Sequence, residues 1–221
     1  MEIFETIWTA LTTENEVLMN LIFIPEVFLE IFINMLLFTT LLKISANKTT
    51  KIKYVIILST IVNISTIIIP NPYCSCLNLI ALFALVLVFF KTTVLKAILS
   101  CALPLVITVL CESIIAKLAF IFFSFDVNSL ANIPIYRLGI SLMVQLSDFL
   151  FYLFIKYFKI QILMLENMSK KSKIIFILNF VLAIIAIAIQ FLITGFYLNK
   201  LPIYIVIFSN LSLIAYVLLS I

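Results

Sequence analysis

Seven long apolar stretches take up nearly the whole of this chain and limit its fold more than any other feature. A membrane-spanning helix needs roughly 20 mainly apolar residues. In lipid, only helices and closed barrels satisfy all their backbone hydrogen bonds. The stretches are continuously apolar, whereas barrel strands alternate between apolar and polar residues. The sequence therefore predicts an all-α fold, a polytopic membrane helical bundle.

The composition supports a lipid environment. The chain is 65% hydrophobic and 11% charged, whereas a soluble domain is typically about 45–50% apolar and about 25% charged. The net charge of +4 does not indicate a nucleic-acid partner, because the lysines occur in short groups between the apolar stretches. The expected partner is the lipid bilayer, and the expected location is a cell membrane.

The stretches predict one transmembrane domain over residues 1–221, with no internal repeat. Residues 1–16 have apolar side chains at helical spacing, and Trp8 among them favours a membrane interface, so they predict an interfacial amphipathic helix. The predicted spans that follow are residues 17–42, 54–70, 77–90, 97–125, 135–155, 174–198 and 203–221.

The lysines predict the orientation of these spans, because positive residues concentrate in cytoplasmic loops. Alternate loops hold four, two and five of the 14 positive residues, and the other three are Lys117, Arg137 and Lys200. The acidic N-terminus is therefore expected outside and the C-terminus in the cytoplasm. Lys117 is expected to reach the membrane interface with its side chain, and a pair with a group on another helix is the alternative.

The chain ends at Ile221 without a polar tail after the last apolar stretch. This ending favours the membrane part of a longer protein. A natural end at this position is an equally weighted alternative, since terminal residues vary widely in length and order.

Four carboxyl groups lie inside the apolar stretches, namely those of Glu26, Glu30, Glu112 and Asp148. An ionisable group in hydrocarbon costs about 3 kcal/mol or more, so such groups usually face a bundle interior. Burial and neighbouring like charges both disfavour the ionised form, so some of the four are expected to be protonated.

Two polar stripes arise from the helical spacing of these acids. Glu26, Glu30 and Asn34 follow each other at intervals of four, and Ser141, Gln145 and Asp148 at intervals of four and three. The stripes predict a buried polar network that acts as a ligand site or proton path, or else joins the helices by hydrogen bonds. Its predicted members are Glu26, Glu30, Asn34, Glu112, Gln145 and Asp148.

The absence of histidine excludes imidazole catalysis, imidazole metal sites and a phospho-accepting histidine within these residues. Cys74 and Cys76 fall in a predicted outward loop over residues 70–76, where two thiols are too few for a zinc site. We therefore expect no metal, no cofactor and no catalytic constellation here; a carboxyl pair such as Glu30 with Asp148 is the one exception considered.

The architecture resembles a known family. Seven spans, an outside acidic amphipathic start, a first span reading IPEVFLEIFINMLLF and a last span directed to the cytoplasm resemble the N-terminal membrane sensor domain of Agr-type histidine kinases from low-GC Gram-positive bacteria. The resemblance implies a quorum-sensing receptor of a two-component system in a bacterial plasma membrane. It implies an extracellular peptide or small ligand, and signalling through the last helix to a dimeric cytoplasmic kinase part, which alone would carry enzyme activity.

Other membrane proteins of this size give different expectations. The peptidase that processes such peptides depends on a histidine and a cysteine, and this chain has no histidine. The substrate-binding subunits of energy-coupling-factor transporters have a similar length, although they typically have six spans. A proton- or cation-coupled carrier that uses the acidic residues is the third alternative.

Overall fold

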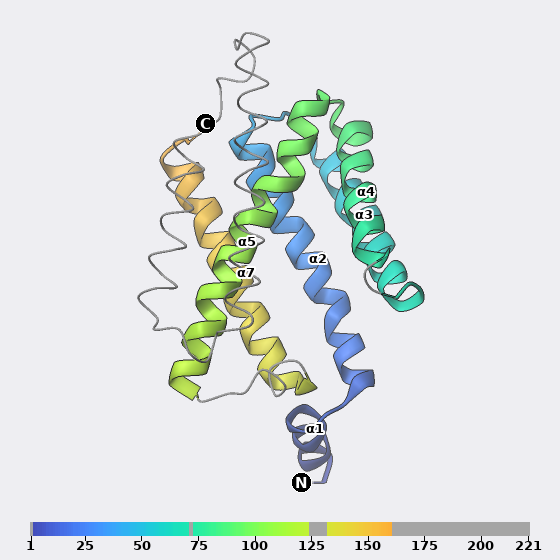
Figure 1. Ribbon diagram of the computed structural model, residues 1–221, viewed down its shortest axis with the longest axis vertical. Helices are drawn as coiled ribbons and strands as arrows, with labels where there is room; N and C mark the ends of the chain where they lie inside the picture. The colour runs from blue at the N-terminus through green and yellow to red at the C-terminus, as the bar shows by residue number, and fades with distance from the viewer. Residues whose placement is uncertain (1, 71–72, 124–131, 161–221) are drawn as a thin grey trace.

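The computed structural model describes residues 2–70, 73–123 and 132–160, and these ranges contain helices and no strand. The helices, shown in Figure 1, are α1 (Glu2–Thr12), α2 (Glu16–Leu41), α3 (Lys48–Ile68), α4 (Tyr73–Phe90), α5 (Val94–Phe123) and α7 (Pro134–Tyr157). The prediction of an all-α fold is confirmed for the described ranges.

Five of these helices are long and apolar enough to cross a bilayer: α2, α3, α4, α7 and the Val94–Ala119 part of α5. The chain is therefore a multi-pass membrane protein that contacts lipid. The predicted spans 174–198 and 203–221 lie outside the described residues, so the total of seven spans stays a prediction.

Asparagine side chains set the starts of two spans. The Asn15 side chain accepts a hydrogen bond from the backbone N–H of Leu18 and thereby separates α1 from α2. The Asn47 side chain caps α3 by accepting from Thr50 at 2.7 Å. Because of this cap, α3 begins six residues before the predicted start of the span at Tyr54.

Successive spans among α2, α3, α4, α5 and α7 run in opposite directions, so α2 and α7 are parallel neighbours and each end of the bundle has its own set of helix ends. The C-terminal ends of α2, α4 and α7 and the N-terminal ends of α3 and α5 meet at the upper end of Figure 1, while α1 lies at the opposite end. We call these the lysine end and the α1 end. In the described part of the chain, every lysine except Lys117 lies at the lysine end: Lys43, Lys48, Lys51, Lys53, Lys91, Lys96, Lys156 and Lys159.

The tightest packing lies toward the lysine end. Buried apolar side chains of α2 are concentrated from Ile31 onward, and they pack with the first turns of α3 and α5 and the last turns of α4 and α7. Three buried rings form the centre of this core: Phe38 contacts Tyr54 and Phe90 edge to face, with ring centroids 5.9 and 5.3 Å away. Tyr54 and Phe90 are themselves 5.1 Å apart.

Three lysines directly after helices have a left-handed backbone. Lys43, Lys91 and Lys159 follow α2, α4 and α7 with φ of 50°, 46° and 53°. After α2, the N–H of Ile44 bonds to the carbonyl of Thr39, and the N–H of Lys43 to that of Thr40. This pattern is a Schellman cap, in which glycine is the usual left-handed residue. Lysine here places positive charge beside the helix carbonyls at the expense of backbone strain.

We expect Lys43→Gly to raise the free energy of unfolding by about 0.5 kcal/mol, because glycine adopts the left-handed conformation without a Cβ clash. Lys53→Gly is the control, since Lys53 lies inside α3 and its replacement should lower stability by about 0.5–1 kcal/mol. Unfolding of both variants in bicelles measures the difference. A loss of stability in Lys43→Gly would contradict the strain argument.

Candidate polar site between α2, α5 and α7

The two predicted polar stripes face each other across the contact between α2 and α7. The amide nitrogen of Gln145 on α7 donates to the backbone carbonyl of Glu26 on α2 at 3.0 Å. The same nitrogen lies 3.4 Å from the hydroxyl of Ser141, one turn earlier. Gln145 therefore bridges the helices through a carbonyl that lies one residue after Pro25 in the α2 span.

The one arginine of the chain neutralises the outermost acid of the site. Nε of Arg137 lies 3.7 Å from a carboxylate oxygen of Glu26, and the guanidinium lies over the ring of Phe23 with 5.7 Å to its centroid. The Ser141 hydroxyl also hydrogen-bonds to Glu26. The Glu26 side chain is 11% exposed and that of Arg137 is 38% exposed, so the pair links the interior to the surface.

Asp148 connects α7 to α5. Its carboxyl group accepts a hydrogen bond from Thr108 Oγ1 at 2.8 Å, and the Cys111 thiol bonds to the same group. Asp148 is 2% exposed. A buried carboxyl group held by only a hydroxyl and a thiol has fewer donors than it can use.

The structure brings the four predicted acids together but does not bury them all. Glu30 interacts electrostatically with Glu26, Glu112 and Asp148. Gln145 and Asp148 are buried as predicted, and Asn34 is half-buried. Glu30 and Glu112 have exposed surface in the described part of the chain, so the burial of these two stays a prediction. Before Ile31, α2 buries only Val27, so this part of the helix has few neighbours that could cover Glu30.

Buried oxygens without a donor collect on the facing stripes. Within the described ranges, six side chains have a buried oxygen without a hydrogen-bond partner, and two of these, Asn63 Oδ1 and Thr92 Oγ1, lie outside the stripes. The other four lie on the stripes: Glu26 Oε1, Asn34 Oδ1, Gln145 Oε1 and Asp148 Oδ1. A buried acceptor without a partner costs about 1–3 kcal/mol. The site therefore offers four buried oxygens that no donor in the described residues satisfies.

Three contributors were not predicted from the sequence: Arg137, Thr108 and Phe23. Arg137 carried a usable signal, because it precedes Ser141 by four residues and extends the α7 stripe by one turn. Thr108 lies one turn before Glu112 on α5, but a lone threonine in an apolar helix is not distinctive. Nothing in the spacing identifies Phe23 among 21 phenylalanines.

Two other expectations are corrected. Lys117 is 3% exposed and has an interaction partner, so it is a buried residue of α5 and not an interface anchor. Cys74 and Cys76 lie in the first turn of α4 and not in a loop, because α4 begins at Tyr73. Cys74 is buried and accepts from Asn78 Nδ2 at 3.4 Å.

The described ranges contain no group of three or more Asp, Glu, Cys or His side chains placed to hold a metal ion. Comparison with models of protein families, with curated proteins and with solved structures gives no match to this chain.

Proposed function

We propose that this chain is a membrane receptor domain that recognises a ligand at the polar site between α2, α5 and α7. The observation that carries the proposal is the set of four buried acceptor oxygens without donors, gathered on helices that are otherwise apolar. Polar groups inside a membrane are energetically costly, so they usually mark a functional site. A bundle joined only by structural hydrogen bonds has no need for surplus acceptors.

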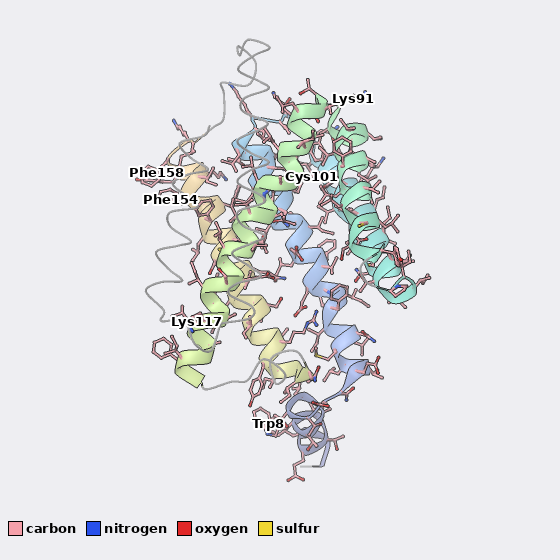
Figure 2. All side chains as sticks on the ribbon, in the orientation of Figure 1. Trp8, Lys91, Cys101, Lys117, Phe154 and Phe158 are labelled. Carbon is pink, nitrogen blue, oxygen red and sulfur yellow. The ribbon has the colours of Figure 1, made fainter. Side chains whose placement is uncertain are left out.

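The charge distribution supports an orientation for this receptor. Lysines gather at one end of the bundle, and α1 with its exposed Glu5 lies at the other (Figure 2 labels Lys91 and Trp8 at the two ends). By the preference of positive residues for the cytoplasm, the lysine end faces inward. The ligand then enters from the outer, α1 end, in a bacterial plasma membrane.

The proposed output follows the resemblance to Agr-type sensor domains. The ligand is an extracellular peptide or small molecule, and binding favours one packing of the helices around the polar site. The change passes through the last span to a cytoplasmic kinase part in a homodimer. The tightly packed lysine end supports this proposal, because a rigid core transmits a rearrangement of helices better than a loose one.

A reconstituted receptor tests the function. The chain is joined after Ile221 to the dimerisation and ATP-binding module of a histidine kinase and placed in liposomes. Peptide fractions from the culture medium of the source bacterium are then added on the α1 side. We expect autophosphorylation to change by about fivefold or more, as for a coupling free energy of at least about 1 kcal/mol.

The same liposomes separate a receptor from a carrier. Unchanged phosphorylation together with uptake of labelled solute from these fractions would replace the receptor by a transport function. Glu26→Gln should reduce the response to the fractions. Glu16→Gln is the matched control, because Glu16 is exposed in the first turn of α2 and lies outside the site.

A further inference from the structure

We propose that the ligand presents at least two positively charged N–H groups, ammonium or guanidinium, to the polar site. This inference rests on the proposed receptor function and specifies the chemistry of its ligand. It follows from the balance of donors and acceptors, the charge of the surrounding residues and the length of the site.

Three donors of the site are directed at its own acceptors. Thr108 donates to Asp148, the Gln145 amide donates to Glu26, and Arg137 faces the Glu26 carboxylate. The atoms that stay unpartnered within the described ranges on these stripes are all oxygens. A ligand that offered only acceptors would leave them unsatisfied, whereas N–H donors would satisfy them.

The carboxyl groups favour a charged donor over a neutral one. Glu30 interacts with the three other acids, and Glu112 interacts with Asp148, so the free oxygen of the buried Asp148 belongs to this cluster. Against four acids, Arg137 is the one cation placed at the site by a contact in the described residues. Charge-assisted hydrogen bonds to carboxylates are about twice as strong as neutral ones.

The α1 end adds an acidic approach to the site. Glu5, Glu14 and Glu16 are exposed there, and the described lysines other than Lys117 lie at the far end. A surface of one charge raises the local concentration of oppositely charged ligands and speeds their association. An anionic ligand would be repelled along the same route.

The spread of the acceptors favours an extended organic cation over a metal ion. Glu26 and Asn34 are eight residues apart on α2, which corresponds to about 12 Å along a helix. No single ion reaches acceptors at that separation, and the described residues offer no metal-binding group. A chain with positive groups at both ends can contact two neighbouring acceptors of this row together.

Agmatine, with a guanidinium at one end and an ammonium at the other, is a suitable probe. Its binding to the full chain in nanodiscs is measured by calorimetry at fixed pH and ionic strength. We expect saturable binding, and no saturable binding of butylurea, which has N–H donors without charge. Sodium chloride should weaken agmatine binding no more than choline chloride does at the same ionic strength, because both salts act only by screening charge.

Variants locate the binding. Asp148→Asn and Glu30→Gln should each weaken agmatine binding about tenfold, the equivalent of losing about 1.4 kcal/mol. Glu30 is exposed, so its variant tests the proposal even if Asp148→Asn fails to fold. Glu5→Gln on α1 is the control and should change the dissociation constant less than about twofold, because Glu5 affects mainly the rate of approach.

Three results would overturn the inference: no saturable binding of agmatine, equal binding of butylurea, or agmatine binding that Glu30→Gln leaves unchanged. Specific competition by sodium over choline would assign the site to an inorganic cation instead. The outcome is separable from that of the proposed function. A peptide fraction that drives phosphorylation although agmatine does not bind would keep the receptor and reject its cationic ligand. Agmatine binding without any signalling response would keep the cation site and reject the receptor function.

Discussion

Phe38→Ala is expected to lower the free energy of unfolding by about 3–5 kcal/mol. The Phe38 ring is 1% exposed and lies against Tyr54 and Phe90, so its loss leaves a cavity where α2, α3 and α4 meet. Lipid solvates apolar side chains well, so most of this cost comes from lost packing and not from transfer to water. Edge-to-face ring contacts add about 0.5–1.5 kcal/mol each.

Phe32→Ala is the matched control on the same helix. Phe32 is 39% exposed, so truncation removes contact mainly with lipid and should cost less than about 1 kcal/mol. Both variants are compared by unfolding in bicelles. Equal destabilisation by the two substitutions would show that the ring cluster is not the centre of the core.

Arg137→Met is expected to destabilise the bundle by about 2–3 kcal/mol. Removal of one partner of a buried ion pair costs about 3–5 kcal/mol, because the other charge is left uncompensated. The expected value is smaller here, since Arg137 is 38% exposed and its contact with Glu26 is 3.7 Å long. The substitution also removes the cation–π contact between the Arg137 guanidinium and the Phe23 ring, which is worth about 0.5–1 kcal/mol.

Rescue by a second substitution separates charge from packing. Glu26→Gln removes the uncompensated carboxylate, so the double variant Glu26→Gln with Arg137→Met should regain more than half of the lost stability. The four proteins are compared by unfolding in bicelles at one pH. Additive losses in the double variant would mean that Arg137 stabilises the bundle independently of Glu26.

The helices could be predicted well because lipid imposes a simple rule on the sequence. Each predicted span between residues 17 and 155 coincides with a helix, and the errors concern helix ends. The prediction started α3 at Tyr54 and α4 at Leu77, where the apolar residues begin. The helices begin at Lys48 and Tyr73, because Asn47 caps α3 and because polar residues continue a helix beyond the hydrocarbon.

The sequence predicted which polar residues share a face of each helix, but not how far the neighbouring helices cover that face. Spacing placed Gln145 and Asp148 on one face of α7 and Glu26 on a polar face of α2, and the hydrogen bond from Gln145 to the backbone carbonyl of Glu26 joins these two helices. Spacing says nothing about how far neighbouring helices cover that face. The exposed surface of Glu30 and the burial of Lys117 depend on that coverage, which the spacing does not give.

The chain has a single tryptophan, Trp8, on the exposed side of α1, and α1 packs on α7, the helix that carries Arg137 and Asp148. Indole emission responds strongly to the polarity around the ring, and tryptophan prefers the headgroup region. The unmodified protein therefore contains its own fluorescent reporter. Quenching by lipids brominated at known depths reads the immersion of the N-terminal helix directly, with no label attached.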